Sequence, residues 1–219
     1  MDHIQASDIA ERCQRNWDYS RPVTDEDIKT LTHVATTMPT KQNVDYFELL
    51  VSTNPKFNQS CYDIAVNTLD PSYSEENGNL RNAQVNAPLL MIWVPVYDNP
   101  AMTERVVDPG DERKTERGNR SLSIGISSGA TALTAAQLGY KTGFCVCMDW
   151  PNLKDLVRED FTDPEVVRIV DKLGKNNEGL CLGIGHPDSG FKRTDVVKDN
   201  KVVLQIRSFD KEIKTTIIK

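Results

Sequence analysis

The chain has 219 residues, a formal net charge of −6 and a charged-residue content of 26%. This acidic balance argues against a general binding surface for nucleic acid or an anionic membrane, so any phosphate site must be built locally from a few basic side chains. A chain of this length can bury a core without disulfides or metals. We therefore expect residues 1–219 to form one domain, with residues from about 201 to 219 as an extended arm.

The first residues, MDHIQASDIAERCQ, contain neither an apolar core nor a cleavage signature, so they do not resemble a secretory signal. The chain has five cysteines, and an odd number without such a signal indicates free thiols in a reducing compartment. We therefore expect a cytoplasmic protein.

The N-terminal part of the chain predicts two helices and a strand. Ser7–Arg15 is expected to be a short helix with Ser7 as its cap, and a second helix begins at the cap residue Thr24 and stops at Met38-Pro39. A polar loop over residues 40–45 then leads into the strand YFELLVST.

The middle of the chain holds one helix, one buried strand and a long charged segment. A helix is predicted over Pro55–Leu69, followed by a turn over residues 70–78. Pro88–Val96 is a nearly continuous apolar run, which is typical of a strand covered on both faces. Asp98–Arg120 is charged and poor in large apolar residues, which indicates a loop that is functional, helical in part or mobile.

Ser121–Tyr140 contains no charged residue, and small residues fill most of its positions. It predicts a helix in which Gly125 and Gly129, four residues apart, lie on one face and allow a close approach of another backbone. That second backbone can belong to the centre of the domain or to a second copy of the chain.

The remaining segments alternate between strands and helices. Strands are expected at residues 142–148 and 180–185, helices at 152–159 and 164–173, and a β-prone stretch at the end. Alternation of this kind favours an α/β or α+β fold around a mixed sheet.

Three small groups of residues have side chains that bind anions or metals or act in catalysis in other proteins. Arg12 and Arg15 can form a fork for a phosphate, but the pair alone favours compensation of a helix dipole. Cys145 and Cys147, two apart on the expected strand, have no second pair with ligand spacing, so no metal site is predicted. His186 lies near no nucleophile-elbow pattern, so no catalytic triad is predicted either.

Four segments together resemble the nitroreductase family of flavoenzymes. They are ERCQRNWDYSRPVTDEDIKTL, MPTKQNVDYFELLVST, NAPLLMIWVPV and SGATALTAAQLGYKTGFCVCMD. The later LGIGHPD and Lys192-Arg193 are similar to the family's closing glycine strand and basic phosphate contact. The resemblance covers nearly the whole chain, in the same order and with matching spacing.

The resemblance implies an α+β fold with a mixed central sheet flanked by helices, a long central helix at a homodimer interface, and a C-terminal arm that reaches the partner. It also implies FMN at that interface, with Thr40, Lys41 and Asn43 supplied from the other chain. The residues that it places at the cofactor are Arg12, Cys13, Arg15, Pro39, Thr40, Lys41, Asn43, Cys145, Val146, Cys147, Lys192 and Arg193.

The implied activity is that of an FMN-dependent oxidoreductase. NADH or NADPH would reduce the flavin, which would then reduce a nitro-compound, a quinone or a similar small acceptor by ping-pong turnover; no protein acid or base is assigned. Two departures, Asp45-Tyr46 in place of Gln-Pro and the C-V-C strand exit, leave an alternative open. In this alternative the protein is a flavin-binding dimer with little or no turnover, in a binding or redox-sensing role.

Overall fold

The computed structural model of the chain describes residues 1–65, 81–97, 112–157, 160–206 and 214–217. Its helices are α1 (His3–Ala10), α2 (Asp25–Thr37), the 3-10 turn η1 (Lys41–Asn43), α3 (Pro55–Asp63), α5 (Glu112–Gln137), α6 (Trp150–Val157) and α7 (Pro164–Asn176). Its strands are β1 (Phe47–Ser52), β2 (Leu89–Pro95), β3 (Lys141–Cys145), β4 (Leu180–Gly185), β5 (Asp195–Lys198) and β6 (Lys201–Gln205).

The central sheet has four strands in the order β1-β2-β4-β3, and each neighbouring pair is antiparallel. The α+β class is confirmed, but the expected mixed sheet is corrected to an antiparallel one in its described strands. The register gives the reason. The end of β1 lies beside the start of β2, since Ser52 pairs with Leu90, and the end of β3 lies beside the start of β4, since Cys145 pairs with Cys181. The β1–β2 and β3–β4 connections therefore leave and re-join the sheet at the same end, whereas the connection between β2 and β3, which contains α5, crosses from one end of the sheet to the other.

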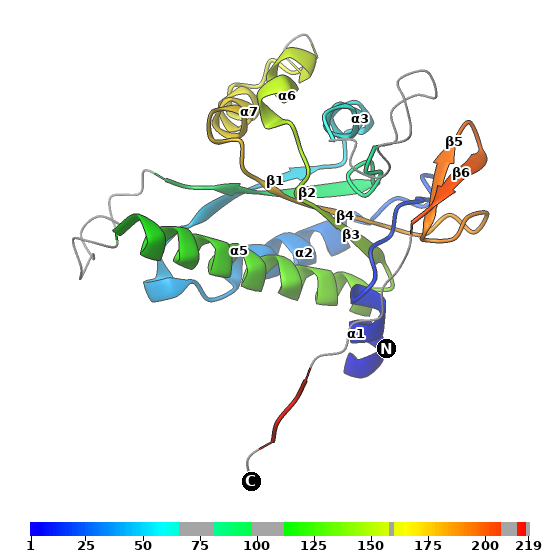
Figure 1. Cartoon of the computed structure of the whole chain (residues 1–219), viewed down its shortest axis with the longest axis horizontal. Helices are drawn as coiled ribbons and strands as arrows, with labels where there is room; N and C mark the ends of the chain where they lie inside the picture. Colours follow the sequence, from blue (N-terminus) through cyan, green and yellow to red (C-terminus); the bar gives the residue numbers. More distant parts are fainter. Residues whose placement is uncertain (66–80, 98–111, 158–159, 207–213, 218–219) are drawn as a thin grey trace.

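Helices cover both faces of the sheet (Figure 1). α2 and α5 lie on one face, where they pack on Leu89, Met91 and Trp93 of β2. α3, α6 and α7 lie on the other face, over Leu90 and Ile92. Every residue of β2 is buried, which confirms the prediction of a strand covered on both sides.

A buried serine joins three elements of the first layer. Trp93 of β2 donates through Nε1 to Oγ of Ser127 in α5 at 2.7 Å, and Ser127 donates in turn to the carbonyl oxygen of Ala35 in α2 at 2.6 Å. The hydroxyl group is fully used as acceptor and donor, so this polar contact is satisfied inside the core.

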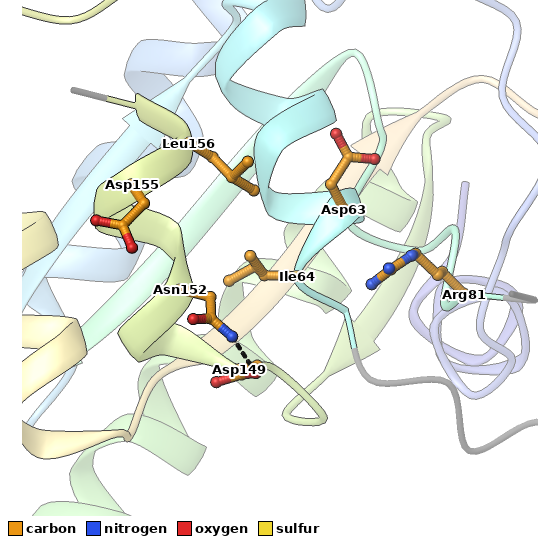
Figure 2. A pocket seen from close by; sticks show the side chains of 7 residues that line it. All are labelled: Asp63, Ile64, Arg81, Asp149, Asn152, Asp155 and Leu156. Carbon is orange, nitrogen blue, oxygen red and sulfur yellow. Dashed lines mark hydrogen bonds between the residues drawn. The ribbon is translucent and has the colours of Figure 1, made fainter. Parts of the chain in front are cut away.

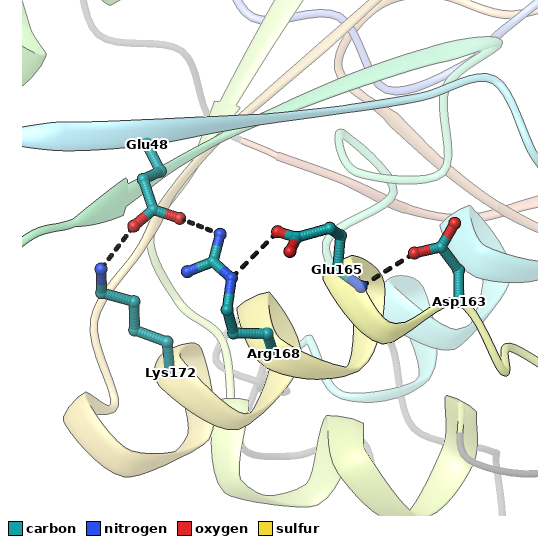
Figure 3. A network of polar contacts seen from close by, with 5 residues as sticks. All are labelled: Glu48, Asp163, Glu165, Arg168 and Lys172. Atoms are coloured by element: carbon teal, nitrogen blue, oxygen red, sulfur yellow. Dashed lines mark hydrogen bonds and ion pairs between the residues drawn. The ribbon is translucent and has the colours of Figure 1, made fainter.

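An ion-pair network attaches α7 to the sheet (Figure 3). Glu48 of β1 accepts hydrogen bonds from Arg168 at 2.7 Å and Lys172 at 2.6 Å, and Arg168 also donates to Glu165 at 2.9 Å. Asp163 caps the start of α7 by accepting from the Glu165 backbone N–H at 2.8 Å. The hydrogen bond from Arg168, followed by that from Lys172, lowers the pKa of the Glu48 carboxyl group.

The helix predicted at the N-terminus is displaced. α1 begins after Asp2, which forms a capping box with Gln5, whereas Ser7 lies inside the helix and donates to the carbonyl oxygen of His3. The helix ends at Ala10, so Arg12 and Arg15 lie beyond it and do not share a helix face. The second helix is confirmed, because Thr24 caps α2 by accepting from the Asp27 N–H.

Other boundaries also differ from the prediction. Glu112–Arg120, expected in the charged loop, already belongs to α5. Lys201–Gln205 pairs with β5 of the same chain, so the extended arm can begin only after this hairpin. The segment 214–217 is exposed and extends away from the body of the chain (Figure 1). The predicted turn at 70–78 and the first part of the charged segment lie outside the described residues. Among the described helices, none is both long and apolar enough to cross a membrane.

Candidate functional site

The segment that follows α1 runs along the free edge of β3. The Gln14 N–H donates to the carbonyl oxygen of Thr142 at 2.8 Å. Gly143 permits this approach, because a Cβ atom there would lie only 2.4 Å from the Gln14 carbonyl oxygen. Farther on, Trp17 forms a bridge with Pro187, just beyond β4. Residues 12–17 are therefore held in an extended path at the edge of the sheet.

Asn16 joins this segment to the second basic segment of the chain. Its Nδ2 group donates to the carbonyl oxygens of Lys192 at 2.8 Å and Asp195 at 3.0 Å. The side chain is buried, and sequence reasoning missed it because a single asparagine gives no local signal of such a distant contact. The bonds bring the segment that carries Arg12 and Arg15 beside the segment that carries Lys192 and Arg193; these four residues are named here the basic cluster.

Arg15 has an unusual environment within this basic cluster. Its Nε atom is buried and has no hydrogen-bond partner in the described part of the chain. Burial is the main cause that lowers the pKa of Arg15, and the nearby positive charge of Arg193 acts in the same direction, whereas Cys13 and Cys145 oppose it. A cation that is partly removed from water beside a second cation is unfavourable unless an anion compensates both. The cluster is therefore suited to bind an anionic group.

The strand beside the cluster ends earlier than predicted. β3 stops at Cys145, so Cys145 and Cys147 do not lie two apart on one strand with parallel side chains. Cys145 is buried, Val146 is 65% exposed, and Cys147 is half-buried. Burial raises the pKa of Cys145 to about 11, so it is a thiol and not a thiolate at neutral pH. The backbone turns outward here, next to the basic cluster.

The remaining predicted site residues lie at the other edge of the sheet. Pro39, Lys41 and Asn43 are exposed, and Thr40 is half-buried, on the segment that leads into β1. Asn43 adopts a left-handed backbone conformation with φ of 58°, which asparagine tolerates better than most residues. β1 and β3 are the two edge strands. Phe47 at the start of β1 lies at the Pro95 end of β2, whereas Thr142 of β3 lies level with Leu89 at the other end, so this group and the basic cluster lie at opposite edges and opposite ends of the sheet.

One face of α5 is exposed and apolar. Leu122 is 58% exposed and Ile126 is 39% exposed, while a Cβ atom at Gly125 or Gly129 would meet no atom within 4 Å. The uncharged helix is thus buried on only one side by its own chain. Of the two alternatives for the glycines, close packing at the centre of the domain is wrong, and packing against a second copy stays a prediction.

A hollow of about 420 Å³ lies between α3 and α6 (Figure 2). Its lining residues are Asp63, Ile64, Arg81, Asp149, Asn152, Asp155 and Leu156. Arg81 donates to the carbonyl oxygen of Ala65, and the three carboxylates outnumber this one cation. Like charge repels an anion, so this hollow does not suit a phosphate. No predicted site residue lines it, and no group of described residues has the arrangement of a metal site.

No family model and no curated protein sequence matches the chain. Solved structures do match it. A nitroreductase family protein from Clostridium novyi has a TM-score of 0.57 at 14% identity, over 86% of this chain and 87% of that one. A nitroreductase with bound FMN from Bacteroides fragilis has a TM-score of 0.55 at 14% identity, over 93% and 98%. A Staphylococcus epidermidis protein proposed to be an NAD(P)H:FMN oxidoreductase has a TM-score of 0.57 at 13% identity, over 95% of each chain. The chain therefore has the nitroreductase fold.

Proposed function

We propose that the protein is an FMN-dependent oxidoreductase that takes hydride from NADH or NADPH and reduces a nitro-compound, a quinone or a similar small acceptor. The observation that carries the proposal is Arg15, a partly buried cation whose Nε lacks a protein partner. The fold supports it, since a similar structure holds FMN and another is a proposed NAD(P)H:FMN oxidoreductase.

The basic cluster fits the phosphate of FMN. Arg12, Arg15, Lys192 and Arg193 would hold it, since guanidinium groups form strong charge-assisted hydrogen bonds with phosphate oxygens. Cys13 would contribute a weak S–H donor where the family prefers serine. The backbone of residues 145–147 would run beside the ring system.

The bound flavin would supply the hydride and electron transfer, while the protein supplies binding, orientation and electrostatics. No described acid or base is assigned a catalytic role. Charge on the exposed Lys41 would lie near the ring or the ribityl chain if this segment comes from a second chain.

Two features of the single chain support a homodimer. The exposed face of α5 around Leu122 and Ile126 is apolar, and its glycines allow the same helix of a second copy to approach closely on a two-fold axis. The two groups of predicted site residues lie on opposite edges of one sheet, and a second chain can bring residues 39–43 to the basic cluster of the first. The segment 214–217 would reach the partner.

The test is the affinity for FMN, measured by quenching of flavin fluorescence. Arg12→Ala, Arg15→Ala and Arg193→Ala should each weaken binding, and Arg15→Ala by about tenfold or more, because a hydrogen bond to a charged group contributes roughly 1.5–3 kcal/mol. Arg168→Ala, which removes an arginine from the ion-pair network on α7, is the matched control and should leave the affinity unchanged. Unchanged affinity in all three site variants would refute the assignment.

A further inference from the structure

Two cysteines from distant parts of the chain lie beside the basic cluster. Both are free thiols; Cys13 is half-buried, whereas Cys145 is 5% exposed. Both thiols act on the charge of Arg15. Burial raises the pKa of Cys145, and the nearby Cys13 adds to this effect. The two sulfur atoms and the guanidinium group therefore share one neighbourhood, and the proposed function uses neither thiol as a redox group.

The backbone path shows why the two cysteines approach each other. The segment that follows α1 runs antiparallel to β3. Its Trp17 ring lies 3.2 Å from the Cβ position of Gly185, whose register partner is the first residue of β3. Its Gln14 N–H donates to the carbonyl oxygen of Thr142, the second residue of β3. The residue before Gln14, which is the first of the two cysteines, therefore lies toward the end of β3, where the strand finishes at Cys145.

A disulfide between these cysteines requires only a small movement. The bond from Gln14 to β3 sets the register, which places Cys13 beside Gly143 and makes it a diagonal neighbour of the last residue of β3. Diagonal neighbours on antiparallel segments have Cα atoms about 7–8 Å apart, and a disulfide requires less than about 7 Å. Cys13 belongs to neither a helix nor a strand. A shift of about 1 Å at this residue therefore closes the distance without disturbing the pairing of the sheet.

The other three cysteines are less suited to pair with Cys145. Cys61 and Cys181 are fully buried, and burial raises the pKa of both thiols. Cys147 is half-buried but lies only two residues farther along the chain, and short, stiff loops are unfavourable to close. Cys13 is thus the partner that combines access to solvent with a long connecting chain.

The basic cluster selects the molecule that oxidises this pair. Reactive cysteines in proteins lie in partly exposed, electropositive surroundings, and the half-buried Cys13 lies between Arg12 and Arg15 in the sequence. Positive charge raises the local concentration of anions. A small disulfide that carries carboxylate groups is therefore favoured over a neutral or cationic one.

We propose that Cys13 and Cys145 form a reversible disulfide when the chain reacts with a small anionic disulfide, and that this bond ties the segment that carries the first two basic residues to β3. The inference goes beyond the proposed function and requires no bound cofactor. The Cys13 thiolate attacks one sulfur atom of the reagent, so the S–S bond of the reagent breaks and one thiolate leaves. The Cys145 thiol then passes its proton to this thiolate and attacks the Cys13 sulfur. The second thiolate leaves and takes up the proton that Cys13 had lost. The pair loses two electrons and two protons, and the reagent becomes two thiols.

The experiment treats the full-length chain, without added FMN, with dithiodipropionate or cystamine, which are small disulfides of similar size and opposite charge. Peptides are then mapped by mass spectrometry without reduction. We expect a peptide pair linked through Cys13 and Cys145, and dithiothreitol should remove the link. An uncharged cysteine peptide corrects for the intrinsic reactivity of each reagent. Relative to this peptide, the chain should prefer the anionic reagent by about fivefold or more at low salt.

Single variants separate the two steps of the reaction. Cys145→Ser should accumulate the mixed disulfide on Cys13, and Cys13→Ser should form no link to Cys145. Cys61→Ala, which replaces a fully buried cysteine of α3, is the control and should give the same link as the wild type. The inference is overturned by a link from Cys145 to Cys147 or Cys181, by a mixed disulfide that persists in the wild type, or by equal corrected rates for the two reagents. If Cys145→Ser does not fold, the peptide map of the wild type still decides.

Discussion

Replacing Gly129 by leucine distinguishes effects on the stability of one chain from effects on the association of two chains. In the single chain, a Cβ atom at Gly129 would meet nothing within 4 Å, so the side chain has room. The substitution even favours the helix, since glycine costs about 1 kcal/mol relative to alanine in a helix interior and leucine costs far less. The free energy of unfolding of the single chain should therefore not fall.

In a two-fold dimer in which α5 packs against its copy, each chain adds one leucine to the contact, so the interface is overpacked at two sites. Overpacking costs about 1–3 kcal/mol at each site, so two sites weaken the dimer by about 2–6 kcal/mol. Since each 1.4 kcal/mol is a factor of ten, the dimer dissociation constant should increase by a factor of about 30 to about 20,000.

The assay is sedimentation equilibrium over a range of protein concentrations, with FMN affinity measured on the same samples. Lys175→Leu adds the same side chain at an exposed position of α7, on the opposite face of the sheet, and should leave both quantities unchanged. If Gly129→Leu dimerises as tightly as the wild type, α5 is not the interface. A wild type that is monomeric at micromolar concentration while it holds FMN would refute the dimer itself.

Three further results are expected. Replacing Cys145 and Cys147 by serine should leave nicotinamide oxidation largely intact, and loss of turnover with FMN still bound would favour a thiol role. Glu48→Gln should lower the free energy of unfolding at neutral pH but not in acid. Because the pKa of Glu48 is lowered in the folded chain, its carboxylate stabilises the fold fully above the ordinary glutamate pKa, and this stabilisation is lost as the pH falls through the lowered value. An equal loss of stability in urea unfolding at both pH values would contradict this. Ser127→Ala should cost about 1–3 kcal/mol, because it leaves the buried indole N–H of Trp93 unpaired; a loss below about 0.5 kcal/mol in urea unfolding would show that the core re-pairs it.

The elements predicted correctly from the sequence are those with local signals. α2 has a cap at Thr24, an acidic first turn and a proline just beyond its end, and β2 is an unbroken apolar run. Each pattern is readable without knowledge of the rest of the chain. The uncharged helix was recognised for the same reason, although its exposed face could not be inferred from composition alone.

The errors arose where distant contacts decide the local conformation. Residues 12–17 follow α1 and carry helix-compatible side chains, yet they are extended because Gln14 pairs with Thr142 and Asn16 bonds to the Lys192 segment. Likewise, the polar stretch Glu112–Arg120 is predicted to be a loop but is helical in the structure. There Arg120 stacks on the Tyr97 ring at 4.0 Å and donates to the carbonyl oxygen of Val96 at 2.9 Å.

The candidate site likewise contains residues that the sequence predicts and residues whose role only the fold reveals. The basic residues are predicted from the resemblance, and the structure joins the two segments that carry them through Asn16. Asn16 could not be predicted, because a single asparagine gives no local signal of its bonds to Lys192 and Asp195.

The most direct test of the account is anaerobic stopped-flow reduction of the purified protein loaded with FMN. On mixing with NADH or NADPH, we predict bleaching of the flavin absorbance bands at a rate that rises with nicotinamide concentration, followed by recovery when a quinone or a nitro-compound is added. Protein that binds FMN but is bleached by neither nicotinamide would contradict the proposed activity and leave a flavin-binding protein without turnover.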